Sequence, residues 1–284
     1  MKPEFEKAAN ILASNDPPIK LVKVDCTEGG KSVCSKFSVQ GYPTLKIFKG
    51  AEATSEYNGP REAAGIAKYM KAQVGPSAKD LVDVKAAEAF LGKDEAAVVG
   101  FFSGSSSSLQ GALAKVADKL RESMRFGVST AQDVNEKYGY ADHVVLFRPK
   151  HLSNKFEPDS VVYDGSSSKD AISSWIDANL HGLVGHRTVD NSAQFKNPLV
   201  VAYFGVDYVK NAKGTNYWRN RMLKVAKSLQ DDSVLSKATF AISNKDDFQP
   251  EISEYGFEYI TDDKPRVAMR DAKGGKFVMK DVFS

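Results

Sequence analysis

The sequence predicts an α/β protein built from tandem domains, each with a mixed central sheet flanked by helices. Two observations lead to this fold class. Buried-strand patterns such as Ala96–Phe102 alternate with amphipathic helical patterns such as Leu109–Glu122. Because a crossover between parallel strands places a helix over the sheet, this alternation favours a sheet covered on both faces. The second observation is a repeat of domain size.

The repeat is visible in three sets of similar segments. The first set begins at positions 7, 115 and 224, which are 108 and 109 residues apart. The second set precedes a strand each time, and the third precedes the last helix of the first two units. The sets are Lys7–Leu12, Lys115–Leu120 and Lys224–Leu229; Lys36–Val39, Lys137–Tyr140 and Glu254–Phe257; and Tyr57–Gly59 and Tyr163–Gly165. A period of this length indicates tandem domains rather than a solenoid.

The first unit, residues 1–75, begins with a helix and has no strand before it. Phe5, Ala8, Ala9 and Leu12 follow helical spacing. The predicted order is helix Met1–Ser14, strand Ile19–Asp25, a turn and short helix over Cys26–Val39, strand Thr44–Phe48 with a hairpin to Tyr57, and helix Arg61–Gln73. Gly75–Ser77 is typical of a linker. We therefore expect an incomplete domain that leaves apolar sheet surface uncovered.

The second and third units, residues 76–183 and 184–284, repeat the alternation of strands and helices. The second unit predicts strands over Leu81–Val84, Ala96–Phe102, Phe126–Ser129, Val144–Phe147 and Val161–Tyr163, with helices over Ala86–Leu91, Leu109–Glu122, Asp133–Tyr138 and Lys169–Leu180. The third predicts strands over Leu199–Phe204, Thr239–Ser243, Val267–Arg270 and Lys276–Met279, with helices over Tyr217–Gln230 and Asp247–Tyr255. The complete order is βαβαβαββα, and the third unit lacks its final helix.

Composition and motif searches argue against several kinds of site. The net charge of +3 gives no reason to expect nucleic acid as a partner, and no apolar run approaches the ~20 residues that span a bilayer. No signal peptide is recognisable. The four histidines lack metal-ligand spacing, and Ser103–Ser108 is typical of a flexible loop without a nucleophile elbow. We expect no metal and no cofactor.

Four motifs resemble the protein disulfide isomerase family, in particular its calnexin- and calreticulin-associated member. They are Val24–Cys26, Gly41–Phe48, Asn58–Arg61 and Asn211–Arg221. The resemblance covers essentially the whole chain and implies tandem thioredoxin folds, a place in the endoplasmic reticulum lumen and a role in glycoprotein folding. It also implies that Tyr42, Pro43 and Thr44 form the cis-proline loop. The chain would be a fragment, truncated at both ends.

In this family the first domain carries Cys-Gly-His-Cys at the start of the helix that here begins at Met1. The helix N-terminus and a neighbouring histidine lower the thiol pKa there. This chain has only Cys26 and Cys34, and no Cys-x-x-Cys. The resemblance matches these two residues to a non-catalytic disulfide; a redox-regulatory pair is the alternative. We expect a redox-inactive chain as given, although thiol–disulfide exchange would hold for a parent with the missing residues.

A basic and aromatic segment, Asp207–Lys224, is the remaining candidate site. It contains five cations, Lys210, Lys213, Arg219, Arg221 and Lys224, with Tyr208, Tyr217 and Trp218 among them. Composition alone also fits a solvated helix face with Trp218 in the core. The resemblance implies that Lys213 and Arg221, with Lys155 of the second unit, contact the acidic arm of calnexin- and calreticulin-type lectin chaperones. Trp218 is a fourth candidate, and unfolded glycoproteins would be indirect partners. The alternative is a general chaperone module that holds unfolded chains through an apolar groove in the third unit.

Overall fold

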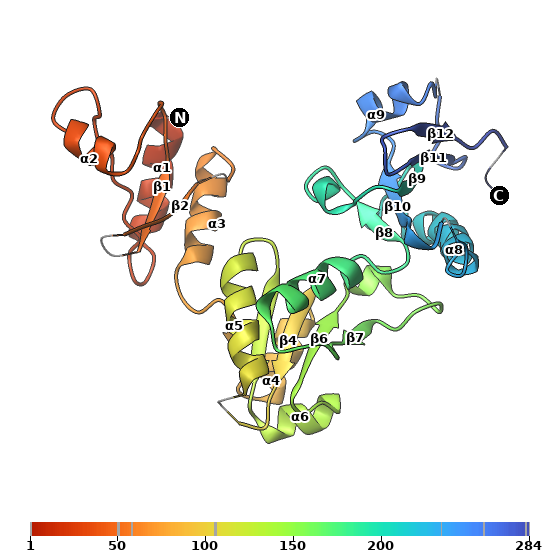
Figure 1. Ribbon diagram of the computed structural model, residues 1–284, viewed down its shortest axis with the longest axis horizontal. Helices are drawn as coiled ribbons and strands as arrows, with labels where there is room; N and C mark the ends of the chain where they lie inside the picture. Colours follow the sequence, from red (N-terminus) through yellow and green to blue (C-terminus); the bar gives the residue numbers. More distant parts are fainter. Residues whose placement is uncertain are drawn as a thin grey trace. The chain divides into compact units, whose positions relative to one another are not determined.

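The computed structural model describes the chain apart from Met1, Gly50, Ala51, Asn58, Ser105, Ser106, Val234, Glu258, Val282 and Ser284. Figure 1 shows its elements coloured along the chain, from red at the N-terminus to blue at the C-terminus. The chain separates into two compact units, and the second of them contains both the second and the third unit predicted from the sequence. The first unit comprises residues 1–77 with 121–123, and the second comprises residues 78–120 with 124–284. Parts of the predicted loop Ser103–Ser108 and of the Tyr57–Gly59 motif lie outside the described residues.

The first unit consists of a helix pair and a hairpin. Its elements are α1 (Lys2–Ala13), α2 (Lys31–Lys36), β1 (Lys46–Lys49), β2 (Glu52–Glu56) and α3 (Ala63–Gln73). Strands β1 and β2 pair antiparallel. Helix α1 packs on α3 through two small clusters, one around Ala8 and Ile66 and one around Leu12 and Ala67. The predicted helices and hairpin of this unit are therefore present.

The predicted strand over Ile19–Asp25 is wrong. Among the described residues this segment belongs to no sheet, although Ile19 is buried and Leu21 packs against both small clusters. A strand exists only where its backbone N–H and C=O groups pair with a neighbouring strand. No described segment forms such a ladder with it. The apolar alternation identified the packing face but not a pairing partner.

The second unit contains two sheets, and the first of them runs in the order β3-β5-β4-β6-β7. Its strands are β3 (Lys79–Asp80), β4 (Ala97–Phe101), β5 (Arg125–Ser129), β6 (His143–Phe147) and β7 (Ser160–Val162). Strands β3, β5 and β4 are parallel to one another, β6 is antiparallel to β4, and β7 is antiparallel to β6. Helices α5 (Ser108–Leu120) and α7 (Lys169–Asn179) cover one face, and α4 (Val84–Leu91) and α6 (Gln132–Tyr138) cover the other.

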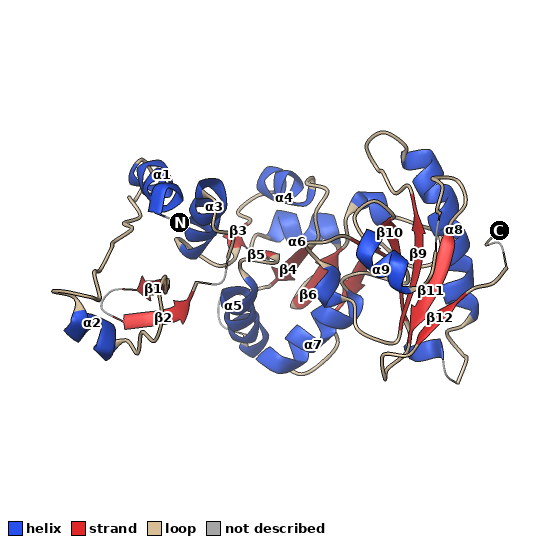
Figure 2. Ribbon diagram, turned by 90° about the horizontal axis from the view of Figure 1, so that it is seen from above, coloured by secondary structure: helices blue, strands red, loops and turns tan. Residues whose placement is uncertain are grey.

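The second sheet has the same plan, in the order β8-β10-β9-β11-β12. Its strands are β8 (Gly185–Arg187), β9 (Leu199–Phe204), β10 (Thr239–Asn244), β11 (Arg266–Arg270) and β12 (Lys276–Val278). Helix α8 (Ala212–Ser228) covers one face and α9 (Gln249–Glu254) the other (Figure 2). The mixed sheets flanked by helices confirm the predicted fold class, with the first domain partly present.

Three elements differ from the sequence prediction by more than their end residues. Strand β8 was not predicted, because three residues are too short to show a period. The first strand of the second unit lies at Lys79–Asp80 instead of Leu81–Val84, because Asp83 accepts a hydrogen bond from Ala86 N and starts α4 early. Helix α8 begins five residues before Tyr217. No helix within the described residues is long and apolar enough to cross a membrane.

Candidate functional site

Helix α8 begins early because its first turn is closed by local side chains. Asn211 is the N-cap and its Oδ1 accepts a hydrogen bond from Gly214 N at 3.0 Å. Just before it, the Asp207 carboxylate accepts from Val209 N and Lys210 N at 2.8 and 2.7 Å. These N–H groups lower the pKa of Asp207. Residues 212–216, which precede the helix predicted over Tyr217–Gln230, are therefore helical, and Lys213 is exposed in the first turn.

Arg221 lies on the solvent side of α8 and is held by two aromatic rings. Its guanidinium carbon is 3.8 Å from the Tyr217 ring centroid and 5.3 Å from that of Trp218. Its Nη2 also donates a hydrogen bond to the Tyr217 hydroxyl at 2.6 Å. Cation–π contacts of this kind fix a guanidinium without neutralising its charge. Arg221 is therefore fixed in position while its positive charge is kept.

Tyr217 is a member of this site that sequence reasoning did not single out. The side chain is about half exposed, and it contacts Trp218 with ring centroids 4.9 Å apart. The signal was present in the spacing, because residues four apart on a helix lie on the same face. Trp218 is only half-buried and packs on the core beneath α8. Trp218 thus packs on the core while part of its side chain stays accessible.

Lys155 comes from the first sheet's domain, after the short helix η1 (Lys150–Leu152), and is exposed. Its Nζ is 5.6 Å from the ring centroid of Phe156. Phe156 packs against the same buried cluster as Trp218. The fold therefore brings the Lys155 segment to the core that supports α8.

These cations are not neutralised within the part of the chain that the structure describes. Lys155, Lys213 and Arg221 form no ion pair with a described carboxylate, and the same holds for Lys210 and Lys224. Five cations on or beside one helix create a positive surface that attracts acidic segments. The arrangement concentrates positive charge on and beside α8.

The two cysteines of the chain form a disulfide in the first unit. Cys26 and Cys34 have Cα atoms 5.8 Å apart, and Cys34 is buried in α2. No free thiol remains.

The cis-proline loop expected at Tyr42, Pro43 and Thr44 has a cis Tyr42–Pro43 peptide bond. The Thr44 hydroxyl donates a hydrogen bond to Gly41 O at 2.6 Å. Tyr42 is two-thirds exposed.

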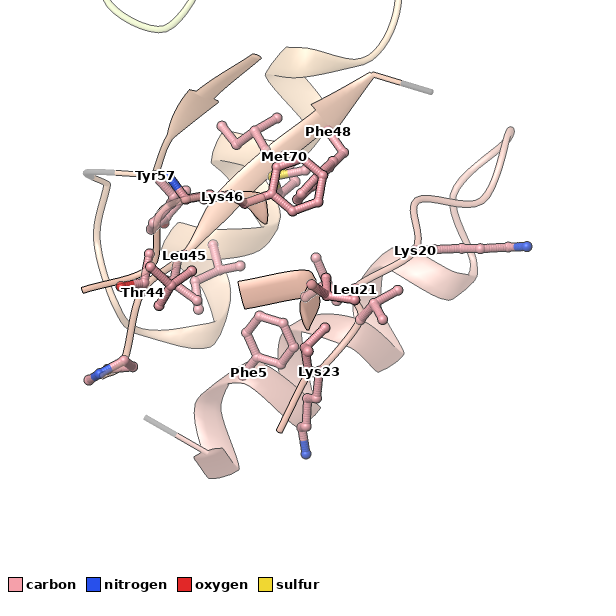
Figure 3. A pocket seen from close by; sticks show the side chains of 18 of the residues that line it. Phe5, Lys20, Leu21, Lys23, Thr44, Leu45, Lys46, Phe48, Tyr57 and Met70 are labelled. Carbon is pink, nitrogen blue, oxygen red and sulfur yellow. The ribbon is translucent and has the colours of Figure 1, made fainter. Parts of the chain in front are cut away.

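An apolar groove of about 1300 Å³ opens in the first unit (Figure 3). Phe5 of α1, Leu21 of the extended segment, Leu45 beside β1 and Met70 of α3 line it. Lys20 and Lys23 extend outward from its rim. Within the described residues no cluster of histidine, cysteine and carboxylate side chains could hold a metal ion.

Comparisons with known proteins agree with this architecture. The family described as "Thioredoxin-like domain" matches residues 102–284, and that described as "Thioredoxin" matches residues 1–72. The whole chain is 42% identical to protein disulfide-isomerase A3 of Gallus gallus, of which it covers 56%. The chain belongs to the protein disulfide isomerase family.

Other members of this family match over comparable lengths. Probable protein disulfide-isomerase ER-60 of Schistosoma mansoni is 37% identical over the whole chain, which covers 58% of that relative. A crystal structure of the bb fragment of ERp72 superposes with a TM-score of 0.63 and 30% identity, over 73% of this chain and 90% of that one. The chain spans little more than half the length of these curated relatives.

Proposed function

We propose that this chain is a non-catalytic docking scaffold that assists glycoprotein folding in the endoplasmic reticulum lumen. Its occupant would be the acidic arm of a calnexin- or calreticulin-type lectin chaperone. Lys155, Lys213 and Arg221 would contact the acidic side chains, and Trp218 and Tyr217 would contribute apolar and cation–π area. Unfolded glycoproteins would then be reached indirectly, through the lectin chaperone.

One observation carries the proposal. Arg221 is held between Tyr217 and Trp218, yet it has no carboxylate partner among the described residues. Arginine, tyrosine and tryptophan are the residue types that dominate binding energy in protein interfaces. A guanidinium already fixed on aromatic rings loses little conformational entropy when an acidic segment binds. The exposed Lys213 and Lys155 would add electrostatic attraction during encounter.

The chemistry of the chain does not favour thiol–disulfide exchange as its activity. Exchange requires a thiolate that attacks a disulfide sulfur. Both cysteines are bonded to each other, and the sequence contains no Cys-x-x-Cys. The relatives are named disulfide isomerases, but we expect this chain to lack that activity.

Calorimetric titration of the full chain with the isolated acidic arm of calreticulin tests the docking proposal. We expect binding that weakens about tenfold or more in Arg221→Ala, the range of an interface anchor. Lys213→Ala should weaken it about three- to fivefold, as expected for an exposed ion pair. High salt should weaken it further, because exposed charges are screened.

A matched control is Lys227→Ala, which removes an exposed cation from the last turn of the same helix. It should leave the affinity within about a factor of two, apart from a small loss of long-range attraction. Absence of binding in a chain whose second unit is folded would refute the docking proposal. Equal losses in Lys213→Ala and Lys227→Ala would show only a diffuse electrostatic attraction.

A second candidate, binding of unfolded chains, is favoured by the apolar groove, which lies in the first unit although we expected such a groove in the third. Apolar contacts weaken little with salt, whereas the docking site should be strongly salt-dependent. Titration with a reduced, unfolded protein at low and high salt distinguishes the two functions. Salt-independent binding that survives Arg221→Ala would favour the chaperone function.

A further inference from the structure

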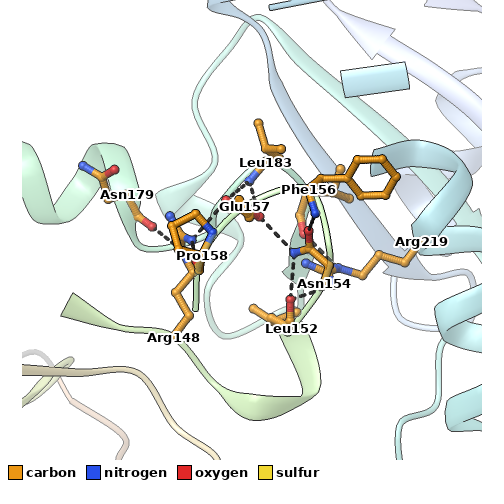
Figure 4. A network of polar contacts seen from close by, with 10 residues as sticks. Arg148, Leu152, Asn154, Phe156, Glu157, Pro158, Asn179, Leu183 and Arg219 are labelled. Atoms are coloured by element: carbon orange, nitrogen blue, oxygen red, sulfur yellow. Dashed lines mark hydrogen bonds and ion pairs between the residues drawn. The ribbon is translucent and has the colours of Figure 1, made fainter. Parts of the chain in front are cut away.

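Arg219 is two residues from Arg221 in α8, but it is almost completely buried, with 1% of its surface exposed. Its Nε donates a hydrogen bond to Val184 O at 3.0 Å, and its Nη1 donates to Leu152 O at 2.9 Å (Figure 4). Burying a guanidinium is costly unless its N–H groups find acceptors. Burial lowers the pKa of Arg219, although arginine remains charged. Its two carbonyl partners therefore hold it in a single position.

Leu152, whose carbonyl accepts this hydrogen bond, is the first residue of the segment 152–157 that carries Lys155. Its carbonyl also accepts a hydrogen bond from Asn154 Nδ2 at 3.1 Å, while Asn154 Oδ1 accepts from Phe156 N at 2.9 Å. The residues on both sides of Lys155 are thus tied to a carbonyl that Arg219 also contacts. The backbone of Lys155 cannot move away from α8 without breaking this set of hydrogen bonds.

Glu157 holds the other end of the same segment. Its carboxylate accepts from Leu183 N at 2.9 and 3.1 Å and forms an ion pair with Arg148 at 3.1 Å. Both side chains of this pair are close to nine-tenths buried. Arg148 Nε also donates to Asn179 O at 2.9 Å. Residues 152–157 are therefore anchored at both ends, and α8 provides one anchor through Arg219 (Figure 4).

We propose that Arg219 is a positioning residue of the docking site. It holds the Lys155 segment against α8, so that cations from two domains act as one surface toward an acidic segment. The proposal rests on the docking function proposed above. It assigns to Arg219 no contact with the partner, because its guanidinium is enclosed by the protein.

A double-mutant cycle separates positioning from a merely structural role. Arg219→Lys keeps the charge, but a single ammonium cannot replace the planar fork that reaches two carbonyls. In titrations of the full chain with the isolated acidic arm of calreticulin, Lys155→Ala should weaken binding about three- to fivefold. Arg219→Lys should weaken it by a similar factor. The double variant should bind no more weakly than either single variant.

The same cycle with Lys213 should behave differently. Lys213 is on α8 itself, so its position does not depend on the bond to Leu152. The effects of Arg219→Lys and Lys213→Ala should therefore multiply. Salt dependence gives a further readout: Arg219→Lys and Lys155→Ala should make the fall of affinity with salt less steep by the same amount.

Arg187 provides a matched control. It is a buried arginine of the same domain, with 7% of its surface exposed, and its Nη2 contacts Glu251 Oε2 at 2.7 Å. It packs over Phe248, in the cluster on the face away from α8. Arg187→Lys should lower the stability of the domain and leave both the affinity and its salt dependence unchanged.

Two results would overturn the positioning role. If Lys155→Ala keeps its full effect in the Arg219→Lys background, positioning is wrong while docking stands. If the wild-type chain does not bind, the docking function fails and the positioning role fails with it. Should Arg219→Lys not fold, Asn154→Ala takes its place in the cycle, because it loosens the same segment from a half-buried position.

Discussion

The first and second units bury their apolar residues to different extents. In the first unit, six of the described buried residues form two clusters of three, both between α1, α3 and the extended segment. In the second unit, each sheet lies between two clusters, and the one beneath α5 and α7 alone has thirteen buried members. A sheet covered on both faces removes more apolar surface from water. We therefore expect the first unit to be the less stable, and the first to be cut in limited proteolysis.

The largest difference should come from cavities in the two cores. Leu113 of α5 is fully buried in the thirteen-residue cluster, so Leu113→Ala should lower the free energy of unfolding of the second unit by about 3–5 kcal/mol. Leu12→Ala in α1 should cost less, about 2–3 kcal/mol, because its cluster is smaller and can collapse more easily.

Both tryptophans, Trp175 and Trp218, belong to the second unit, so tryptophan fluorescence reports the unfolding of that unit alone. Urea unfolding followed by fluorescence and by circular dichroism therefore separates the two units. Leu113→Ala should shift the fluorescence midpoint, and Leu12→Ala should shift only the part of the dichroism transition that fluorescence does not follow. Coincident shifts of both probes in both variants would show that the units unfold as one.

The disulfide should sharpen the comparison, because it acts on the first unit alone. Cys26 and Cys34 are eight residues apart in sequence. A closed loop of this size stabilises by about 2–3 kcal/mol in the chain-entropy model. Cys26→Ser with Cys34→Ser should therefore lower the stability of the first unit by this amount and leave the fluorescence midpoint unchanged. A shift of the fluorescence midpoint would contradict independent unfolding.

Acid should act on the second unit through its histidines, because the first unit contains none. Burial, together with the charges of His151 and Arg219, lowers the pKa of His186 to about 4. The unfolded value is about 6.5, so the folded state favours the neutral ring. The stabilisation is complete above pH 6.5 and is lost as the pH falls toward 4.

Between pH 6.5 and pH 4 we expect protonation of His186 to lower the free energy of unfolding by about 2 kcal/mol, after allowance for its partial exposure. His181, whose pKa burial also lowers, acts in the same direction. Urea unfolding detected by tryptophan fluorescence at several pH values measures how steeply the free energy of unfolding of the second unit falls as the pH is lowered. His186→Gln should reduce this slope, whereas His143→Gln, at an exposed position, should not. An unchanged slope in His186→Gln would contradict the pKa shift.

The smallest effects should come from the helix caps, which the two units provide differently. Helix α8 is capped locally, and Asn211→Ala should cost about 1 kcal/mol of second-unit stability. Helix α3 has no side-chain cap of its own; instead Glu4 of α1 accepts a hydrogen bond from Ala63 N at 2.9 Å. Glu4→Gln should lower the first unit's dichroism midpoint slightly. If Glu4→Gln shifts the unfolding midpoint of its unit as much as Asn211→Ala does, or more, the expectation that the local cap of α8 contributes more would be wrong.

Helix α8 illustrates how far sequence reasoning reached into the site. Its interior followed from helical spacing, but its first turn did not, because Gly214 and Asn216 are typical of loops and the capping by Asn211 overrode them. The same spacing places Arg219 in the stripe of Thr215, Met222 and Ala226, so its burial was readable in principle. We had only counted Arg219 among the five cations of the segment.

The sequence by itself determined most of the alternation of strands and helices and showed the repeat of domain size. These properties depend on local periodicity and turn residues. Only the tertiary structure decided that Ile19–Asp25 forms no strand and that Lys155 lies on a segment bonded to α8. It also showed that Arg219 is almost completely buried, whereas Arg221 is only half-buried. Strand pairing and the satisfaction of a buried guanidinium depend on groups distant in sequence, and local patterns do not specify them.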